Sequence, residues 1–188
     1  MDQHHAHKFQ YDEKERRKRQ NPEELLHAIG LKPGDVFMDI GSNDGFFTLP
    51  AAKMVGESGK VYAVDIDSDA TNRLKEKTNA AWLTNILVQT GEAETTLFCK
   101  GCADIIFYGT VLHDFTDPLQ VLHNAKAMLK PNGKIVNIDW KKKQTEMGPP
   151  MEIRFSEEQV SELIEKAGLR VTEIKDLSPN FYLITAAV

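Results

Sequence analysis

The fold is decided by residues 36–55, which are VFMDIGSNDGFFTLPAAKMV. A short apolar run, Val36 to Ile40, has the composition of a strand that is covered on both faces. A glycine-containing loop, residues 41–45, follows it, and an apolar helical segment starts near Phe46. Glycines let the backbone turn sharply and approach a ligand closely. Taken alone, the pattern also fits a tight strand-to-helix turn without a ligand.

The apolar pattern around this stretch alternates between short β-rich runs and helix-like segments. Such alternation is typical of βα units that build a mostly parallel sheet, so the fold class is α/β. We expect strands at 36–40, 61–64, 86–89, 105–108 and 134–138, and helices at 22–29, 47–55, 69–79 and 118–129. The turn residues 130–133, KPNG, should separate the last of these helices from the fifth strand.

The carboxyl-terminal part of the chain does not continue the alternation of strands and helices. After a long loop at 141–154, Ser156 can cap a helix that Gly168 ends. Two β-rich runs, 169–174 and 181–188, follow with a short turn between them, which predicts a hairpin. We see no repeat or low-complexity segment. We therefore predict one domain at 21–188, preceded by an amino-terminal extension or lid at 1–20.

Polar residues also follow the second and third predicted strands. Asp65 comes directly after the second strand, where a carboxylate can accept both hydroxyl protons of a ribose. Ile66 can lie against the flat face of an adenine, and Glu92, after the third strand, can accept a hydrogen bond from the adenine amino group. Each residue alone also fits an exposed loop. Together, three successive strand ends indicate an adenosine-type ligand.

These motifs resemble those of the class I S-adenosylmethionine (SAM)-dependent methyltransferases. The glycine-rich first motif, the acidic second motif and the adenine-contact segment of that family are similar to DIGSNDG (39–45), VDID (64–67) and TGEAE (90–94). Its fourth motif and fifth strand are similar to DIIFYGTVLHDFTDP (104–118) and LKPNGKIVNIDW (129–140). The resemblance covers nearly the whole chain. It is strongest for the branch with the ubiquinone and menaquinone C-methyltransferases and the arsenite methyltransferases.

The resemblance implies a Rossmann-like three-layer sandwich, with a seven-stranded mostly parallel sheet that ends in an antiparallel hairpin, and SAM as the cofactor. By the same resemblance, the methionine moiety faces the first strand end, the ribose faces the second, and the adenine lies between the second and third. The cofactor-binding residues implied in this way are Asp39, Gly41, Ser42, Asn43, Gly45, Asp65, Ile66, Gly91, Glu92, Ala93, Tyr108 and Gly109.

A general base is needed if the methyl acceptor must lose a proton. Our candidate is His113, with Asp114 beside it, because a histidine with an ordinary pKa of about 6.5 suits this task. His113 also fits a packing or capping role. Tyr108 is a second catalytic candidate, because the resemblance places it beside the transferred methyl group. Trp140 fits either the wall of an acceptor pocket or the core.

Two segments are candidate lids. Arg154 and the loop at 148–150 follow the fifth strand and can close over the site. The segment around Phe9 and Tyr11 can do likewise, or it can be a tail without such a role.

The chain departs from the family pattern at several places. Asn43 stands where the family usually has glycine, and asparagine tolerates the left-handed conformation. GTVL (109–112) replaces the NPPY-like tetrapeptide of enzymes that methylate nucleic-acid bases. Only Cys99 and Cys102 are present, so arsenite is a poor acceptor. We therefore expect a small-molecule acceptor, which the sequence does not identify.

Two other classes of function are weighed against this one. A nicotinamide-dependent oxidoreductase would use the fingerprint GxGxxG, which the loop GSNDG does not match. A non-catalytic SAM-binding module stays open as an alternative, because this fold needs no conspicuous catalytic residue.

The composition restricts partners and compartment. A formal net charge of −5 gives no broad positive field for nucleic-acid binding. The basic run at 14–19 can reach a phosphate or an acidic substrate, or form a solvated helix face. The chain shows no secretory signal and no apolar run near the ~18 residues of a membrane span, so we expect a cytoplasmic protein. We predict no metal centre, interpret Cys99 and Cys102 as an incidental pair in a turn rather than a redox site, and leave the oligomeric state open.

Overall fold

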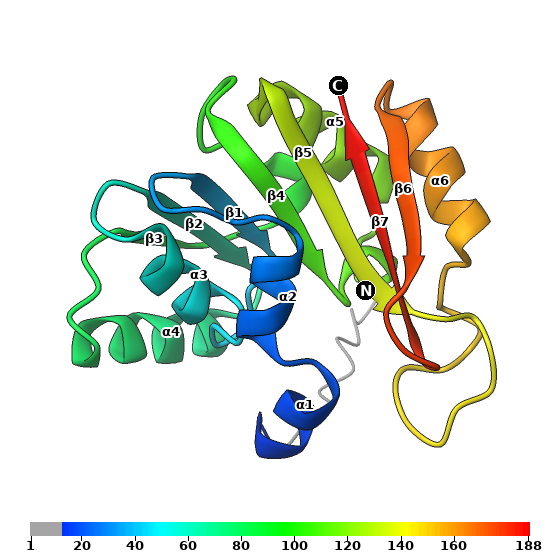
Figure 1. Ribbon diagram of the computed structural model, residues 1–188, viewed down its shortest axis with the longest axis horizontal. Helices are drawn as coiled ribbons and strands as arrows, with labels where there is room; N and C mark the ends of the chain where they lie inside the picture. The colour runs from blue at the N-terminus through cyan, green and yellow to red at the C-terminus, as the bar shows by residue number, and fades with distance from the viewer. Residues whose placement is uncertain (1–12) are drawn as a thin grey trace, which may run out of the picture.

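Seven strands form one sheet in the computed structural model, which describes residues 13–188 (Figure 1). The order of strands across the sheet is β3-β2-β1-β4-β5-β7-β6. β7 is antiparallel to β5 and β6, and the other neighbours are parallel. The strands are β1 (Val36–Ile40), β2 (Lys60–Asp65), β3 (Ile86–Thr90), β4 (Ala103–Gly109), β5 (Leu129–Trp140), β6 (Arg170–Asp176) and β7 (Phe181–Ala187). The predicted α/β fold with an antiparallel carboxyl-terminal hairpin is confirmed.

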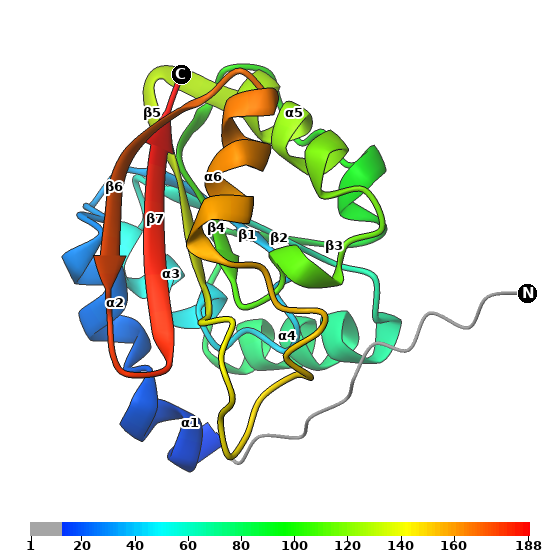
Figure 2. The same cartoon turned by 90° about the vertical axis from the view of Figure 1, so that its right-hand side faces the viewer.

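Helices cover both faces of the sheet and complete a three-layer sandwich (Figures 1 and 2). The α-helices are α1 (Glu13–Arg19), α2 (Pro22–Ala28), α3 (Thr48–Val55), α4 (Ser68–Ala80), α5 (Pro118–Met128) and α6 (Glu157–Lys166). Two short 3-10 helices, η1 (Ala93–Thr95) and η2 (Leu112–Asp114), follow β3 and β4. The apolar sides of α2 and α3 pack on one face of the central strands, and those of α5 and α6 pack on the other.

Polar side chains fix where several helices begin. An Asn, Asp or Ser side chain accepts hydrogen bonds from backbone N–H groups in the first turn, which would otherwise lack partners. The capping residues are Asn21 for α2, Asp67 for α4, Asp117 for α5 and Ser156 for α6. Ser156 caps α6 as predicted, and it also forms a reciprocal capping box with Gln159.

The sheet order places the candidate site. β1 lies between β2 and β4, so the chain leaves β1 toward one side and returns on the other. Ligands of open α/β sheets bind outside the carboxyl ends of the strands at such a switch point. Because β7 is antiparallel, its first residue Phe181 pairs with Trp140 at the end of β5. The same edge of the sheet therefore carries the ends of β1 to β5 and the start of β7.

The beginning of β5 differs from the prediction of a turn at 130–133. Leu129 already pairs with Ala103, and the register then shifts so that Lys134 pairs with Ile105. The intervening residues form an irregularity within the strand rather than a separate turn. A Cβ at Gly133 would lie 2.6 Å from the carbonyl oxygen of Ala103, which explains why glycine stands there.

Two further features were not indicated by the apolar pattern. α1 is an additional helix without a buried residue, and such a helix leaves no amphipathic signal. Cys99 and Cys102 are joined by a disulfide in the segment before β4, at the end of that strand opposite the switch-point edge. Within residues 13–188, no helix has the length and hydrophobicity needed to cross a membrane.

Candidate cofactor and acceptor site

The loop after β1 is shaped by three residues with positive φ. The φ angle is 78° at Gly41, 48° at Asn43 and 96° at Gly45. A Cβ at Gly41 would lie 2.5 Å from a methyl carbon of Val111, and a Cβ at Gly45 would overlap Leu74. Glycine is therefore required at both positions, while Asn43 adopts the left-handed conformation that asparagine tolerates.

The Asp65 carboxylate links the ends of β1 and β2. Its Oδ2 accepts a hydrogen bond from the backbone N–H of Asn43 at 2.7 Å, and its Oδ1 accepts one from the N–H of Asp67 at 2.9 Å. Burial raises the pKa of Asp65, although these hydrogen bonds oppose the rise. Each carboxylate oxygen has further accepting capacity. Asp65 is thus fixed in place and still able to accept hydrogen bonds from two hydroxyl groups of a ligand.

Asp39 is a buried acid near the end of β1. It is 2% exposed, and its Oδ2 accepts a hydrogen bond from the Thr48 hydroxyl at 2.6 Å. Burial raises the pKa of Asp39 to about 6. Burial makes the charged form of this carboxyl group unfavourable unless a positive charge lies beside it. Asp39 is therefore suited to bind a positively charged group of a ligand.

Ser42 offers an unused hydrogen-bonding group in the same loop. Its backbone N–H donates to the carbonyl of Val64 at 3.0 Å. Its hydroxyl is buried and has no hydrogen-bond partner within residues 13–188. Buried polar groups nearly always have a partner, so an orphaned hydroxyl in a glycine loop is consistent with a partner supplied by a ligand.

The end of β3 lies against the end of β2. The N–H of Gly91 donates to the carbonyl of Asp65 at 3.0 Å. Asn124 of α5 donates to the carbonyl of Ala93 at 3.2 Å and thereby fixes the start of η1. Ile66 is 59% exposed and Glu92 is also exposed, so an apolar surface and an acceptor are both open to a flat ring.

The end of β4 presents backbone rather than side chains. A Cβ at Gly109 would lie 2.9 Å from the ring of Phe47. Thr110, the next residue, has a φ of 62°. The Tyr108 side chain is fully buried, and its ring meets Phe115 edge-on with the centroids 6.3 Å apart.

The Tyr108 hydroxyl is buried and has no hydrogen-bond partner in the described part of the chain, and burial raises its pKa. The catalytic role that the resemblance implies for Tyr108 stays a prediction.

His113 forms a buried pair with Asp139 of β5. The distance from His113 Nδ1 to Asp139 Oδ2 is 2.9 Å, and the two side chains are 2% and 1% exposed. The other oxygen of Asp139 accepts the N–H of Trp140 at 2.8 Å, which orients the carboxylate. Burial lowers the pKa of His113, but the hydrogen bond and charge of Asp139, together with the charge of Asp114, outweigh it and leave the pKa raised.

Arg154 anchors the loop that follows β5. Its guanidinium lies 5.1 Å from the centroid of the Trp140 ring. The side chain is almost wholly buried and donates to oxygens of Lys141, Lys143, Thr145, Met147 and Pro149. The residue predicted to close over the site is therefore the centre around which residues 141–154 are folded.

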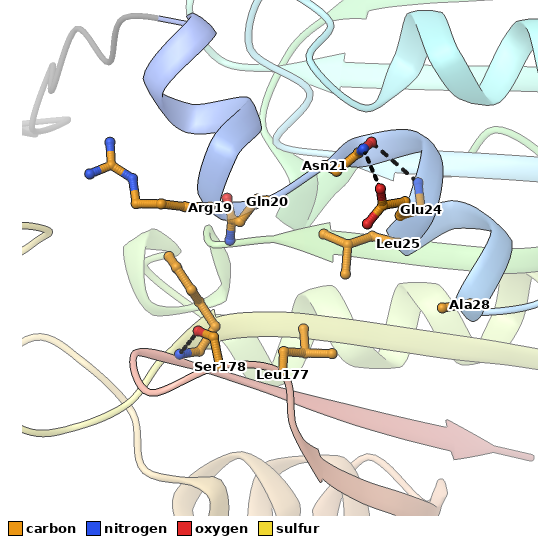
Figure 3. Close-up of a pocket in the computed structure, with 9 residues that line it drawn as sticks. Arg19, Gln20, Asn21, Glu24, Leu25, Ala28, Leu177 and Ser178 are labelled. Atoms are coloured by element: carbon orange, nitrogen blue, oxygen red, sulfur yellow. Dashed lines mark hydrogen bonds between the residues drawn. The ribbon is translucent and has the colours of Figure 1, made fainter.

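α1 lies over the ends of β4 and β5. The Arg16 guanidinium is 4.1 Å from the ring centroid of Phe46. A narrow cavity of about 10 Å³ lies beneath the helix and is lined by Arg16, Arg19, Gln20, Thr110, Trp140 and Phe181. A groove of about 260 Å³ continues outward between α2 and the turn before β7 (Figure 3) and is lined by Arg19, Gln20, Asn21, Glu24, Leu25, Ala28, Leu177, Ser178 and Phe181.

The basic run at 14–19 therefore has two sides. Arg17 pairs with Glu13 and Glu23 on the surface of the helix. Arg16 and Arg19 instead face the cavity beneath it. The surface pairs of Arg17 fit the solvated helix face considered for this run, and its role in reaching a phosphate or an acidic substrate stays a prediction. The expected lid residues Phe9 and Tyr11 lie outside the described residues.

The segment that carries these features matches a known protein family. Residues 31–174 match the model of a methyltransferase domain, and this span contains the ends of β1 to β5. The chain belongs to the methyltransferase-domain family.

Similar proteins agree with this assignment. The chain is 28% identical over 116 residues to the demethylmenaquinone methyltransferase of Bacillus mycoides, across 62% of this chain and 49% of that enzyme. It matches the crystal structure of a SAM-dependent methyltransferase from Aquifex aeolicus with a TM-score of 0.84 and 33% identity, across 94% of this chain and 98% of that one. The chain spans about half the length of the curated relative.

A more distant structure shows the fold alone. Phosphoethanolamine N-methyltransferase 2 of Haemonchus contortus, solved with phosphomonomethylethanolamine and S-adenosylhomocysteine, matches with a TM-score of 0.76 and 15% identity, across 89% of this chain and 52% of that one.

The methyltransferase fold brings most of the predicted residues to one edge, namely the loop at 41–45, Asp65, Ile66 and the loop at 91–93. Sequence reasoning missed Asp139, the partner of His113. Its signal was available, because Asn137 and Asp139 are alternate polar residues in an otherwise apolar strand and so point to the same face. It also missed Gln20, for which the sequence gives no signal.

Proposed function

We propose that this protein transfers the methyl group of SAM to a small-molecule acceptor by in-line displacement. The observation that carries the proposal is the Asp65 carboxylate, held by the N–H groups of Asn43 and Asp67 with accepting capacity left for a ribose. The family match supports this ligand, as does the fold shared with the SAM-dependent methyltransferase of Aquifex aeolicus.

The neighbours of Asp65 fit the remaining parts of SAM. The Asp39 carboxyl and the Ser42 hydroxyl would face the methionine moiety, where a positively charged amino group meets a buried acid. Ile66 and Ala93 would enclose the adenine, with Glu92 accepting from its amino group. Gly41 and Gly45 would let the loop approach the cofactor, because neither position has room for a side chain.

SAM supplies a methyl group already activated by a sulfonium, so the protein has mainly to hold the acceptor at attacking distance in a dry space. Thr110 and Trp140 line the narrow cavity beneath α1 and would border that space.

His113 would remove the proton of an acceptor that must ionise. When the imidazole is neutral, the bond from Nδ1–H to Asp139 leaves Nε2 as the basic nitrogen. Asp139 thus acts as a positioning residue, which fixes the tautomer and the ring orientation.

A calorimetric titration with S-adenosylhomocysteine (SAH), SAM and NADH in parallel tests the cofactor. We expect SAH and SAM to bind and NADH not to bind. Binding of NADH alone would overturn the proposal and assign Asp65 to a dinucleotide ribose. Binding of SAH without methyl transfer to any member of a broad acceptor library would favour a non-catalytic SAM-binding module.

The variant Asp65→Ala tests the orientation of the cofactor. It removes two charge-assisted hydrogen bonds to the ribose, so we expect SAH affinity to fall by about 30-fold or more. Asp44→Ala is the matched control, because Asp44 lies in the same loop but pairs with Lys77 at 2.7 Å. Equal SAH affinity in the two variants would contradict the proposed orientation.

A further inference from the structure

The Gln20 side-chain amide is a buried donor at the end of α1. The residue is 5% exposed, and its Nε2 has no hydrogen-bond partner within residues 13–188. Its Oε1 accepts a hydrogen bond from Arg16 at 3.4 Å, so the carbonyl side of the amide is satisfied and the N–H side is not. Gln20 lines both the narrow cavity and the groove beyond it. A ligand that passes between them can supply the missing acceptor.

Arg19 adds donors at the same place. It lines both spaces as well, and its guanidinium contacts the thioether sulfur of Met147. A thioether is a weak acceptor, so a carboxylate would be a much better partner for this group. Figure 3 shows the Arg19 side chain on one side of Gln20 and Glu24 on the other. Glu24 accepts a hydrogen bond from Asn21 at 2.8 Å and so has its own donor.

The remainder of the groove has a mixed lining, in which apolar side chains stand beside the polar residues Asn21, Glu24 and Ser178. Leu25 and Ala28 of α2 face Leu177 of the turn before β7, and Phe181 stands where the groove meets the narrow cavity. Phe181 and Trp140 contact each other with ring centroids 4.3 Å apart, so the lining continues to the end of β5. A volume of about 260 Å³ is close to the lower end of the range for small-molecule pockets, about 300–1,000 Å³.

We infer that the methyl acceptor is a small carboxylic acid with an apolar body. Arg19 and Gln20 bind its carboxylate where the narrow cavity meets the groove, and the apolar body lies between Leu25 and Leu177. In this placement a carboxylate oxygen faces the cavity; it forms a bond to the methyl carbon of SAM as the bond from that carbon to sulfur breaks, which gives a methyl ester and S-adenosylhomocysteine. This inference rests on the proposed function, since it assigns the groove to the acceptor of the same methyl transfer. It is independent of Asp65 and the cofactor loops.

Calorimetry on the SAH-loaded protein tests the inference with matched probes. Benzoate, octanoate and indole-3-acetate are each compared with the corresponding primary amide, which keeps the shape and removes the charge. We expect at least one carboxylate to bind about tenfold more tightly than its amide, with the preference weakening as salt increases. If no carboxylate is preferred over its amide, the inference is wrong.

Two variants test whether a preference for the carboxylate over its amide arises in the groove. Arg19→Ala should abolish the preference, and Gln20→Glu should reduce carboxylate affinity by about tenfold through like-charge repulsion. Arg17→Ala is the control, because Arg17 lies in the same helix but pairs with Glu13 and Glu23 on its surface. A preference that survives Arg19→Ala overturns the inference.

The SAH titration that precedes each experiment separates the two proposals. Absence of SAH binding would refute the proposed function. Binding of SAH with no carboxylate preference would refute only the acceptor class.

Discussion

The two halves of the carboxyl edge are built in different ways. Over β1 to β3, the site consists of tight loops whose backbone is fixed by a few short-range contacts, such as the Gly41 turn and the Asn43–Asp65 bond. Over β4, β5 and β7, it consists of side chains from segments far apart in the chain, such as Arg19, Trp140 and Phe181. The first half presents features suited to a fixed ligand, SAM. In the proposed function, the second half holds the methyl acceptor.

The largest effect should separate chemistry from cofactor binding. His113→Ala is expected to lower kcat by about 10²- to 10⁴-fold, the usual contribution of a positioned base, with any acceptor that must lose a proton. SAH affinity should change by less than about threefold, because His113 lies in the acceptor half. A parallel loss of SAH affinity would show that the two halves are not separable at this residue.

The pH profile refines the test of His113. Since the pKa of His113 is raised and the neutral ring is the base, activity should fall on the acidic side with an apparent pKa above the ordinary value of about 6.5. Asp139→Asn should lower kcat and shift the acidic fall in activity to lower pH. If the acidic fall in activity stays at the same pH in this variant, Asp139 has only a structural role.

The second prediction concerns the loop of the acceptor half. Arg154→Leu removes the donor shared by oxygens around residues 141–149 and leaves buried oxygens unsatisfied. We expect it to lower the free energy of unfolding by about 2–4 kcal/mol. Urea unfolding measures this loss. SAH affinity, measured under conditions where the variant is folded, should be unchanged.

The third prediction concerns the cofactor half. Gly41→Ala introduces a Cβ that collides with Val111 at a φ of 78°, and we expect SAH affinity to fall by at least about tenfold. Gly56→Ala is the control, because Gly56 has a φ of 66° but open space around its Cα. Both variants should lose about 1 kcal/mol of stability to backbone strain. Equal SAH affinity in the two variants would show that the Gly41 turn does not shape the site.

The smallest effect is a dependence of stability on pH. Because the folded-state pKa of Asp39 is about 6 and its ordinary value is 3.8, folding favours the neutral acid. This contribution is complete below pH 3.8 and is lost as the pH rises through 6. Asp39→Asn stays neutral, so it should exceed the wild type in unfolding free energy by about 1–3 kcal/mol at pH 8 and match it near pH 4.

Urea unfolding at the two pH values measures the difference, and the same variant should bind SAH more weakly. A variant that is less stable than the wild type at pH 8 would show that the Asp39 carboxylate serves the fold rather than a cationic ligand.

The sequence predicts the positions of the loops after β1, β2 and β3 well, for a local physical reason. Each of its features, from the strand at 36–40 to Asp65 and the loop at 91–93, is encoded within a few residues. The φ angles of Gly41 and Asn43 and the buried position of Asp39 follow from that local pattern.

The half of the site over β4, β5 and β7 is harder to predict from the sequence, because its contacts join residues that are far apart in the chain. Gln20 and Trp140 line one cavity although they are far apart in the chain, and α1 has no apolar face to reveal it. Tyr108 stands at the end of β4, and its burial does not follow from alternation, because Phe107 on the other face of this strand is equally buried.

A crystal structure of the complex with SAH tests the central claim most directly. We predict that the ribose hydroxyls lie within hydrogen-bonding distance of the Asp65 carboxylate, that the amino group of the homocysteine moiety lies beside Asp39, and that the sulfur faces the narrow cavity at Thr110 and Trp140. SAH bound with its ribose away from Asp65, or with its sulfur turned away from that cavity, would contradict the account.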